Sequence, residues 1–443
     1  CIRDRVNSQL ALAGLQSSWN FYDYPPGVFA ITQRLLLISQ PNSYRIAPFL
    51  TAAMQMGLQV LIGSRGEHSL TTEVNQGLHI DLDEYDSALA SILEEARLRP
   101  FSGIIGSDDS TVELAAHAAS RLGLPHNPPE AARLTRRKDL ARAHLMLAGC
   151  PVPIHCLIDI SKPLDHQLAG LPWPCVIKPL NMAASRGVIR ANNEDEFRNA
   201  CERIRNIISE STDEFERSHV LVENYIDGIE VAYEGYLHEG KLHTLTVFDK
   251  PDPLVGPFIE ETIYVTPSQL DADSLNIIKQ RVQQACIAFG LTTGPVHAEL
   301  RVNAVDAWIL EVASRTIGGD CARTLDTGTN KNLEQLTVSL AIGEPMQPEA
   351  ITQSRGVMMI PIRQAGLLRR VEGILAAQKV PYIEKIDIVI AEGHELIPLP
   401  EGNQYLGFIF AKADTPEMVT AALRSAHEKL NFVTAPIIKL ASV

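Results

Sequence analysis

Two glutamates near the middle of the chain have the spacing to share one cation. Glu299 lies in the segment 296–302 and Glu311 in the segment 307–313. Both segments alternate apolar and polar residues, which predicts strands, and the stretch from Asn303 to Asp306 between them supplies a turn. Because both glutamates are equally far from Val305, a hairpin centred on that residue would place them directly opposite each other on one face.

Opposed carboxylates repel each other unless a cation lies between them. Mg²⁺ is bound by a few carboxylates together with phosphate oxygens, so the pair Glu299 and Glu311 predicts a site for Mg²⁺ and a nucleotide. The alternative is an exposed acidic pair on the surface of a sheet.

A lysine and a loop of small residues suggest a place for phosphates. Lys178 ends a short apolar segment at 173–179, and the loop after it contains Ala183, Ala184, Ser185 and Gly187. Small residues let a backbone approach an anion closely, and their N–H groups can line it. The spacing matches neither common glycine-rich phosphate motif, so an ordinary hairpin loop is the alternative.

Four further charged residues have both a chemical and a structural interpretation. Lys138 lies near the start of a predicted helix, where a solvated charge is the simpler assignment. Glu223 and Glu230 flank a predicted turn, where they would either contact a nucleoside or face water. Asp109 follows the segment 103–106, at the end of a predicted parallel strand where ligands often bind, and would either accept from a substrate amine or cap the next helix.

Composition narrows the class of protein. The chain has 443 residues, 45% of them hydrophobic, and a formal net charge of −14. This charge argues against general binding to nucleic acids or membrane surfaces. The seven cysteines include no CxxC pair, which favours free thiols in a reducing compartment, and no apolar run has the roughly 20 residues of a membrane span. The first residues lack a signal-peptide core, and a start on Cys1 suggests that the initiator is not shown.

The order of predicted elements indicates an α/β protein with several domains. Residues 1–30 are predicted to be a loosely structured leader. Predicted strands at 35–38, 59–62 and 103–106 alternate with helices at 47–56 and 111–122, which is typical of a parallel α/β unit. A helical stretch follows from residue 128 and ends before Gly149 and Pro151.

Taken in order, these segments resemble an ATP-grasp ligase over roughly residues 31–345. The resemblance rests on Lys138, Lys178 with its small-residue loop, the stretch 223–230, the segment 297–299, and the stretch 311–319. The region 400–411 and the closing helix 418–430 are similar to the C-terminal domain of ATP-grasp L-amino-acid ligases. The alternative there is a packing domain that lines no chemistry.

The resemblance implies an ATP-grasp fold in the α/β (α+β) class with four parts. These are the leader 1–30, an N-terminal parallel α/β domain at 31–125, a two-lobed ATP-grasp domain at 126–354 with a mobile lid subdomain at about 172–245, and a C-terminal α+β domain at 355–443.

The resemblance also assigns roles to residues. ATP binding is implied for Lys138, Lys178, Ser185, Gly187, Glu223, Ile226 and Glu230. Glu299 and Glu311 match the metal carboxylates, and Arg315 matches a catalytic arginine near the transferred phosphate. Substrate contacts are implied for Asp109, Glu261, Tyr264, His297, Gly318 and Arg323. For His297 the alternative is a packed histidine, and for Arg323 it is a surface salt bridge.

Two positions depart from the family pattern. Ala313 stands where an asparagine often gives a third metal contact, so that ligand is absent. Tyr264 stands where a histidine is common, so the family's substrate preference does not carry over.

The implied activity is ATP-dependent joining of an amino-acid carboxylate to an amine, often a second L-amino acid, with release of ADP and phosphate. It would use Mg²⁺ or Mn²⁺, act on small molecules in the cytoplasm, and work without a nucleic acid or membrane partner. A homodimer is an expectation from the family alone. The rival hypotheses are another ATP-grasp enzyme, of the purine-pathway or biotin-carboxylase kind, and a non-catalytic nucleotide-binding module.

Overall fold

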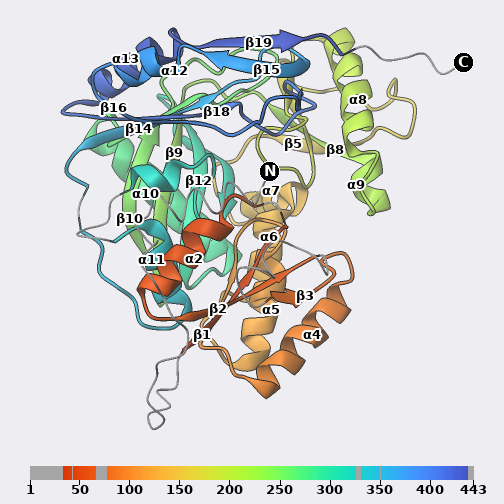
Figure 1. The fold of residues 1–443 in the computed structure, drawn as a ribbon. Helices are drawn as coiled ribbons and strands as arrows, with labels where there is room; N and C mark the ends of the chain where they lie inside the picture. The colour runs from red at the N-terminus through yellow and green to blue at the C-terminus, as the bar shows by residue number, and fades with distance from the viewer. Residues whose placement is uncertain (1–32, 42, 66–76, 326–330, 350, 438–443) are drawn as a thin grey trace, which may run out of the picture. The chain divides into compact units, whose positions relative to one another are not determined.

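The computed structural model describes residues 33–41, 43–65, 77–325, 331–349 and 351–437. The predicted leader, residues 1–30, lies outside these residues. The chain divides into two units, one formed by Cys1–Ala132 with Glu334–Gln347 and the other by Arg133–Leu333 with Pro348–Val443. Figure 1 shows the elements in chain order by colour.

The first unit is a parallel sheet with helices on both faces. Its strands have the order β3-β2-β1-β4, and every pair is parallel. Its elements are β1 (Arg34–Ile38), α2 (Ile46–Gln55), β2 (Gln59–Ser64), β3 (Gly77–His79), α4 (Tyr85–Leu98), β4 (Gly103–Gly106), α5 (Val112–Leu122) and α11 (Leu333–Ala341).

The strand β1 explains why this sheet is covered on both faces. Leu36 and Ile38 pack with α4 and α5, whereas Leu35 and Leu37 pack with α2 and with Val338 of α11. A strand that is apolar at every position must be buried on both sides, which is typical of parallel sheets. The predicted parallel α/β unit is confirmed.

The helical stretch predicted from residue 128 consists of two helices, α6 (Pro129–Arg136) and α7 (Lys138–Leu147). Arg137 between them has an extended backbone, with φ −94° and ψ 105°. Lys138 is therefore the first residue of a new helix, a break that the apolar spacing did not predict.

The second unit holds the segments that the sequence analysis marked for chemistry. Its largest sheet has eight strands in the order β13-β12-β9-β10-β11-β14-β18-β16. Those strands are β9 (Ile229–His238), β10 (Lys241–Asp249), β11 (Ile263–Thr266), β12 (Gly294–Val302), β13 (Ala307–Ala313), β14 (Ser354–Ile360), β16 (Ile383–Ile388) and β18 (Gly407–Ala413). The helix α10 (Ala272–Phe289) contacts β12 and β13, and α13 (Pro416–His427) packs on β14 and β18.

This sheet runs through the predicted boundary at residue 354, because β14 pairs with β11 on one side and with β18 on the other. The C-terminal region also contains the sheet β17-β15-β19 and the helix α12. Their bounds are β15 (Gly366–Glu372), α12 (Ile374–Gln378), β17 (Glu395–Leu396) and β19 (Asn431–Ala435). The four-part domain division remains a prediction.

A smaller antiparallel sheet carries the loop of small residues. Its strands have the order β5-β8-β6-β7, and α8 packs on it through Phe197, Cys201 and Ile204. The elements are β5 (His155–Asp159), β6 (Cys175–Pro179), β7 (Ile189–Ala191), α8 (Glu194–Ile208), α9 (Glu214–Ser218) and β8 (His219–Asn224). A short 3₁₀ helix, η1 (Cys321–Thr324), follows β13 in the other sheet.

The described cysteines are free thiols, as expected: Cys150, Cys156, Cys175, Cys201, Cys286 and Cys321. Within the described part of the chain, no helix has both the length and the apolar character needed to cross a bilayer.

Candidate functional site

The predicted hairpin is present, and Glu299 lies opposite Glu311 in its register. The register contains a bulge: Leu300 pairs with Ile309, yet Glu299 pairs with Glu311, so Leu310 is the extra residue. Without this bulge the pair next to Leu300 and Ile309 would be Glu299 and Leu310. The predicted opposition is therefore confirmed, but it depends on an irregularity that the sequence argument did not contain.

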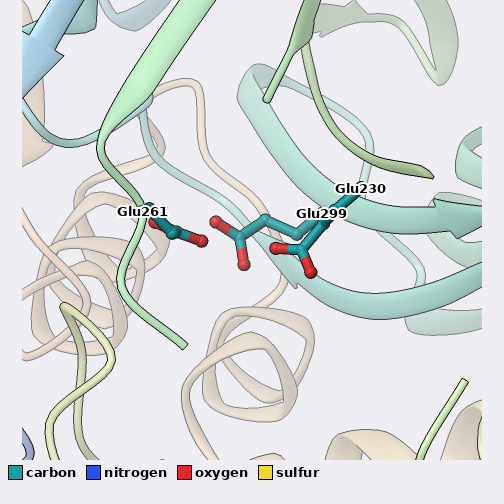
Figure 2. Close-up of side chains that lie close together, drawn as sticks. All are labelled: Glu230, Glu261 and Glu299. Carbon is teal, nitrogen blue, oxygen red and sulfur yellow. The ribbon is translucent and has the colours of Figure 1, made fainter. Parts of the chain in front are cut away.

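Glu299 belongs to a group of three carboxylates that surrounds a lysine. The Lys250 Nζ lies 2.9 Å from Glu230, 2.5 Å from Glu261 and 3.3 Å from Glu299. Figure 2 shows these three carboxylates turned towards one another. The Lys250 side chain is only 2% exposed, so the charges stabilise each other in a site with little water.

The electrostatics of this group favour a charged lysine. Burial alone would lower the pKa of Lys250, but the three carboxylates outweigh burial and raise that pKa well above its usual value. For Glu299, burial acts to raise the pKa, whereas Lys250 and His297 bring it well below the usual value. Glu261 shows the opposite balance, since burial and the charge of Glu299 raise its pKa to about 7.

Glu311 has its own pair of cations. The Lys138 Nζ lies 2.7 Å from Glu311, and the Arg315 guanidinium lies 4.0 Å from it. The backbone N–H of Lys138 also donates to the Leu180 carbonyl at 3.0 Å, which ties the start of α7 to the loop after β6. Lys138 is 16% exposed in its side chain, so the assignment as a solvated helix charge is wrong.

Glu223 and Glu230 do not face water, which excludes that alternative. Glu223 is 2% exposed and Glu230 is 6% exposed. Arg142 Nε lies 2.5 Å and Lys178 Nζ 2.6 Å from the Glu223 carboxylate. Burial would raise the pKa of Glu223, but these two positive charges outweigh it and hold that pKa at about 2.

Glu230 is held by two buried cations. One carboxylate oxygen accepts from Lys250 and the other from Arg301 at 2.8 Å. The Arg301 guanidinium also donates to the carbonyls of Ile226 at 2.8 Å and Leu254 at 3.0 Å. Arg301 therefore fixes the segment after β8, where Ile226 is a predicted ATP-binding residue.

The loop with Ser185 and Gly187 is the hairpin connection between the antiparallel strands β6 and β7. Ala184 and Ser185 have φ values of 56° and 53°, a left-handed conformation that L residues rarely adopt. Gly187 has φ 73°, and a side chain there would clash with Pro179. Its N–H donates to the Pro400 carbonyl at 2.9 Å, so the C-terminal region contacts this loop.

The predicted substrate residues of the second unit lie on or next to β11, β12, β13 and η1. The Tyr264 hydroxyl donates to Glu261 at 2.5 Å, and His297 Nδ1 lies 3.2 Å from the buried Glu234. Gly318 lies between β13 and η1, where its carbonyl accepts from Cys321. His297 lies opposite Ala313 as predicted and is buried, with Glu299 3.7 Å from its other ring nitrogen.

Arg323 takes part in ion pairs, as its structural alternative predicted. Its guanidinium lies 3.1 Å from Asp320 and 2.8 Å from Asp387, and it stacks over the Phe410 ring at 4.3 Å. A third of the side chain is still exposed, so both assignments remain compatible with its surroundings.

Asp109 belongs to the first unit, and its predicted role as helix cap is wrong. The N-cap position of α5 is Thr111, and the turn before it is closed by Asp108, which accepts from the N–H of Ser110 at 3.2 Å. The amine-binding role of Asp109 remains a prediction.

Sequence reasoning missed three buried cations that organise the site: Lys250, Arg142 and Arg301. For Arg301 and Lys250 the sequence contained a signal that could have found them. Arg301 lies two residues after Glu299 on the same strand, hence on the same face, and Lys250 follows directly after β10. Arg142 lies within a helix and had no signal that distinguishes it from a surface charge.

The pair Glu299 and Glu311 suits a magnesium ion better than the group of Glu230, Glu261 and Glu299. Glu230, Glu261 and Glu299 are close enough to share an ion. However, the Lys250 ammonium already contacts all three. Glu299 and Glu311 have side chains that are 22% and 27% exposed, against 5% for Glu230, so an arriving ion can reach them. Two such carboxylates fit the oxygen donor set of Mg²⁺.

Three family models match the chain. Residues 171–324 match the ATP-grasp domain, residues 358–435 match the L-amino acid ligase C-terminal domain 2, and residues 50–126 match the ATP-grasp N-terminal domain. Among solved structures, an L-amino acid ligase from Bacillus licheniformis has a TM-score of 0.76 at 23% identity, covering 91% of this chain and 99% of that one. The predicted fold is therefore confirmed.

Two curated proteins are similar to the chain in sequence. An uncharacterized protein of Sinorhizobium fredii is 21% identical over 366 residues, which is 81% of this chain and 73% of the relative. Carnosine synthase 1 of Gallus gallus is 27% identical over 350 residues, or 74% of this chain. This chain spans 37% of the length of that synthase.

Proposed function

This chain belongs to the ATP-grasp superfamily, and we propose that it is an ADP-forming ligase that joins an amino-acid carboxylate to an amine, in the manner of L-amino-acid ligases. The observation that carries the proposal is the pair Glu299 and Glu311, opposed across a hairpin with Lys138 and Arg315 beside it. This set brings carboxylates for a metal ion together with cations for phosphates.

Chemically, the difficulty is that a carboxylate is a poor acyl donor. Attack of its oxygen on the γ-phosphorus of ATP breaks the bond to ADP and gives an acyl phosphate. The amine then attacks the acyl carbon, phosphate leaves, and the amine loses a proton. Phosphoryl transfer of this kind depends on positioning and on neutralising charge.

Each proposed residue has a task in this scheme. Glu299 and Glu311 would hold Mg²⁺, which supplies positive charge to the phosphates when bound. Lys138 and Lys178 would bind phosphate oxygens, and Arg315 would stabilise the negative oxygen of the tetrahedral state. The loop with Ser185 and Gly187 would exclude water from the acyl phosphate, which water otherwise hydrolyses.

The nucleoside would lie against Glu223, Ile226 and Glu230. Glu230 keeps acceptor capacity for ribose hydroxyls, since a carboxylate has about four lone-pair sites and two cations use only part of them. The amino-acid substrates would contact Glu261, Tyr264, His297, Gly318 and Arg323. Tyr264 and the lack of an asparagine at Ala313 leave the identity of both amino acids open to experiment.

A phosphate-release screen over all pairs of amino acids, with ATP and Mg²⁺, tests the proposal. The expected products are ADP, orthophosphate and a compound whose mass is that of the two amino acids less one water. AMP with pyrophosphate would point to an adenylating enzyme. Turnover with bicarbonate alone would favour a carboxylase, and no turnover with any pair would favour a non-catalytic module.

Variants connect this activity to the site. Glu311→Ala and Lys178→Ala should abolish ADP formation while the protein stays folded by circular dichroism. Glu384→Ala is the matched control, because Glu384 is an exposed glutamate on β16. Normal turnover in either site variant contradicts the proposed residues.

A further inference from the structure

Arg142 connects three segments that carry proposed nucleotide-site residues. Its side chain on α7 is 4% exposed. Nε donates to the Glu223 carboxylate at 2.5 Å, and the two terminal nitrogens donate to the carbonyls of Ile309 at 2.9 Å and Leu310 at 2.7 Å. One guanidinium therefore joins α7, β8 and β13.

The two carbonyls lie at the bulge of the hairpin. Leu310 is the extra residue between the pairs Leu300–Ile309 and Glu299–Glu311. Loss of one residue of register turns a strand's side chains to the other face of the sheet. A regular hairpin with the turn seen here would oppose Glu299 with Leu310 and turn Glu311 away. The contacts of Arg142 thus fall on the residues that decide where Glu311 points.

The same helix and the same carboxylate hold the phosphate lysines. Lys138 is one helical turn before Arg142, on the same face, and its ammonium lies 2.7 Å from Glu311. Glu223, which accepts from Arg142, also holds Lys178 at 2.6 Å. The positions of Lys138, Lys178 and Glu311 therefore all depend on one side chain, that of Arg142.

We propose that Arg142 is a positioning residue for the metal and phosphate site, which fixes the bulge so that Glu311 faces Glu299. This inference rests on the proposed function. A lysine cannot replace Arg142, because three bonds in different directions need the planar fork of a guanidinium, whereas an ammonium donates from a single point.

The experiment compares Arg142→Lys and Arg142→Gln with Arg34→Lys. Arg34 is the matched control, since it is 6% exposed and its guanidinium donates to the Arg99 carbonyl at 2.6 Å and to Glu95 at 2.7 Å, within the first unit. Calorimetry measures binding of ATP with Mg²⁺, and thermal unfolding measures stability. Amino-acid KM and kcat are then measured with the pair found in the screen.

The expected result is that Arg142→Lys weakens binding of ATP with Mg²⁺ about tenfold or more and raises the half-saturating Mg²⁺ concentration, while amino-acid KM stays within about twofold. Arg34→Lys should lower the thermal midpoint similarly without changing nucleotide binding. Unchanged binding in both Arg142 variants overturns the inference, and so does unfolding of both while Arg34→Lys stays folded. Failure of the wild-type protein to bind ATP with Mg²⁺ instead overturns the proposed function.

Discussion

The hairpin β12–β13 and the loop 183–187 both carry proposed ATP-site residues, but they are held in opposite ways. Around the hairpin, carboxylates meet buried cations, with Lys250 at 2% and Arg142 at 4% exposure. The loop is held by the bond from Gly187 to Pro400, by Arg186 donating to the Glu401 carbonyl, and by a pair between Arg203 and Glu401. Both side chains of that pair are more than 40% exposed.

Exposure decides how firmly each region is held. Breaking a buried ion pair leaves an uncompensated charge and costs about 3–5 kcal/mol, whereas an exposed pair contributes about 0–1 kcal/mol. These magnitudes predict that the hairpin keeps its geometry and that the loop opens more easily than the hairpin. This division suits the proposed reaction, in which the metal and phosphates need a constant geometry while nucleotide must enter and leave.

Removal of Lys250 should give the largest effect. Lys250→Met leaves Glu230, Glu261 and Glu299 close together without their cation, so we expect a loss of about 3–5 kcal/mol in stability. Thermal unfolding measures this loss. Lys162→Met is the matched control, because Lys162 pairs with Asp159 at 2.8 Å but is 72% exposed, and it should change stability by less than about 1 kcal/mol.

Equal stability of Lys250→Met and Lys162→Met would remove the contrast between the two regions. It would mean that the three carboxylates are neutralised by protonation or by a bound ion rather than by the lysine.

The hairpin also shows how far sequence reasoning reaches. The alternation of apolar and polar residues predicted β12 and β13 and placed Glu299 opposite Glu311. This was possible because the periodicity of a strand depends only on its own residues. The bulge at Leu310 was not predicted, since it is fixed by bonds from Arg142, more than 160 residues earlier in the chain. Spacing along the sequence cannot report such a contact.

The same limit explains why the contacts of the buried cations and of the loop were not predicted from the sequence. Lys250 gathers glutamates from β9, from β12 and from the segment before β11, so its role exists only in the folded sheet. For the loop 183–187, composition predicted a backbone that can approach an anion closely. The contacts of Gly187 and Arg186 with Pro400 and Glu401 join segments more than 200 residues apart, which is why the sequence did not predict them.

Loosening the loop should affect chemistry more than stability. Arg203→Gln or Glu401→Gln removes a pair worth at most about 1 kcal/mol, which lowers the ratio of closed to open loop about fivefold at most. Water then reaches the acyl phosphate more often. We expect phosphate released per ligated product to rise about two- to fivefold, measured by parallel phosphate and product assays, with an almost unchanged thermal midpoint.

Two further variants make this result specific. Exchange of the charges, Arg203→Glu with Glu401→Arg, should restore the ratio of phosphate to product. Arg198→Gln should leave that ratio unchanged, because Arg198 lies on the same helix α8 but pairs with Glu194 and Asp165. A rise in the ratio for Arg198→Gln would show that α8 as a whole, not its pair with Glu401, controls the loop.

The smallest effect is expected at the turn of the hairpin itself. Arg281 holds Asp306 through two bonds of 2.8 and 2.7 Å, but its side chain is 33% exposed. Arg281→Gln should cost no more than about 1 kcal/mol in stability and should leave binding of ATP with Mg²⁺ unchanged. The reason is that Asp306 lies on the turn side of the bulge, whereas Glu311 lies beyond it, where Arg142 fixes the backbone. If Arg281→Gln weakens nucleotide binding as much as Arg142→Lys does, the turn sets the register of the glutamates, and burial no longer separates the strong contacts of the hairpin from its weak ones.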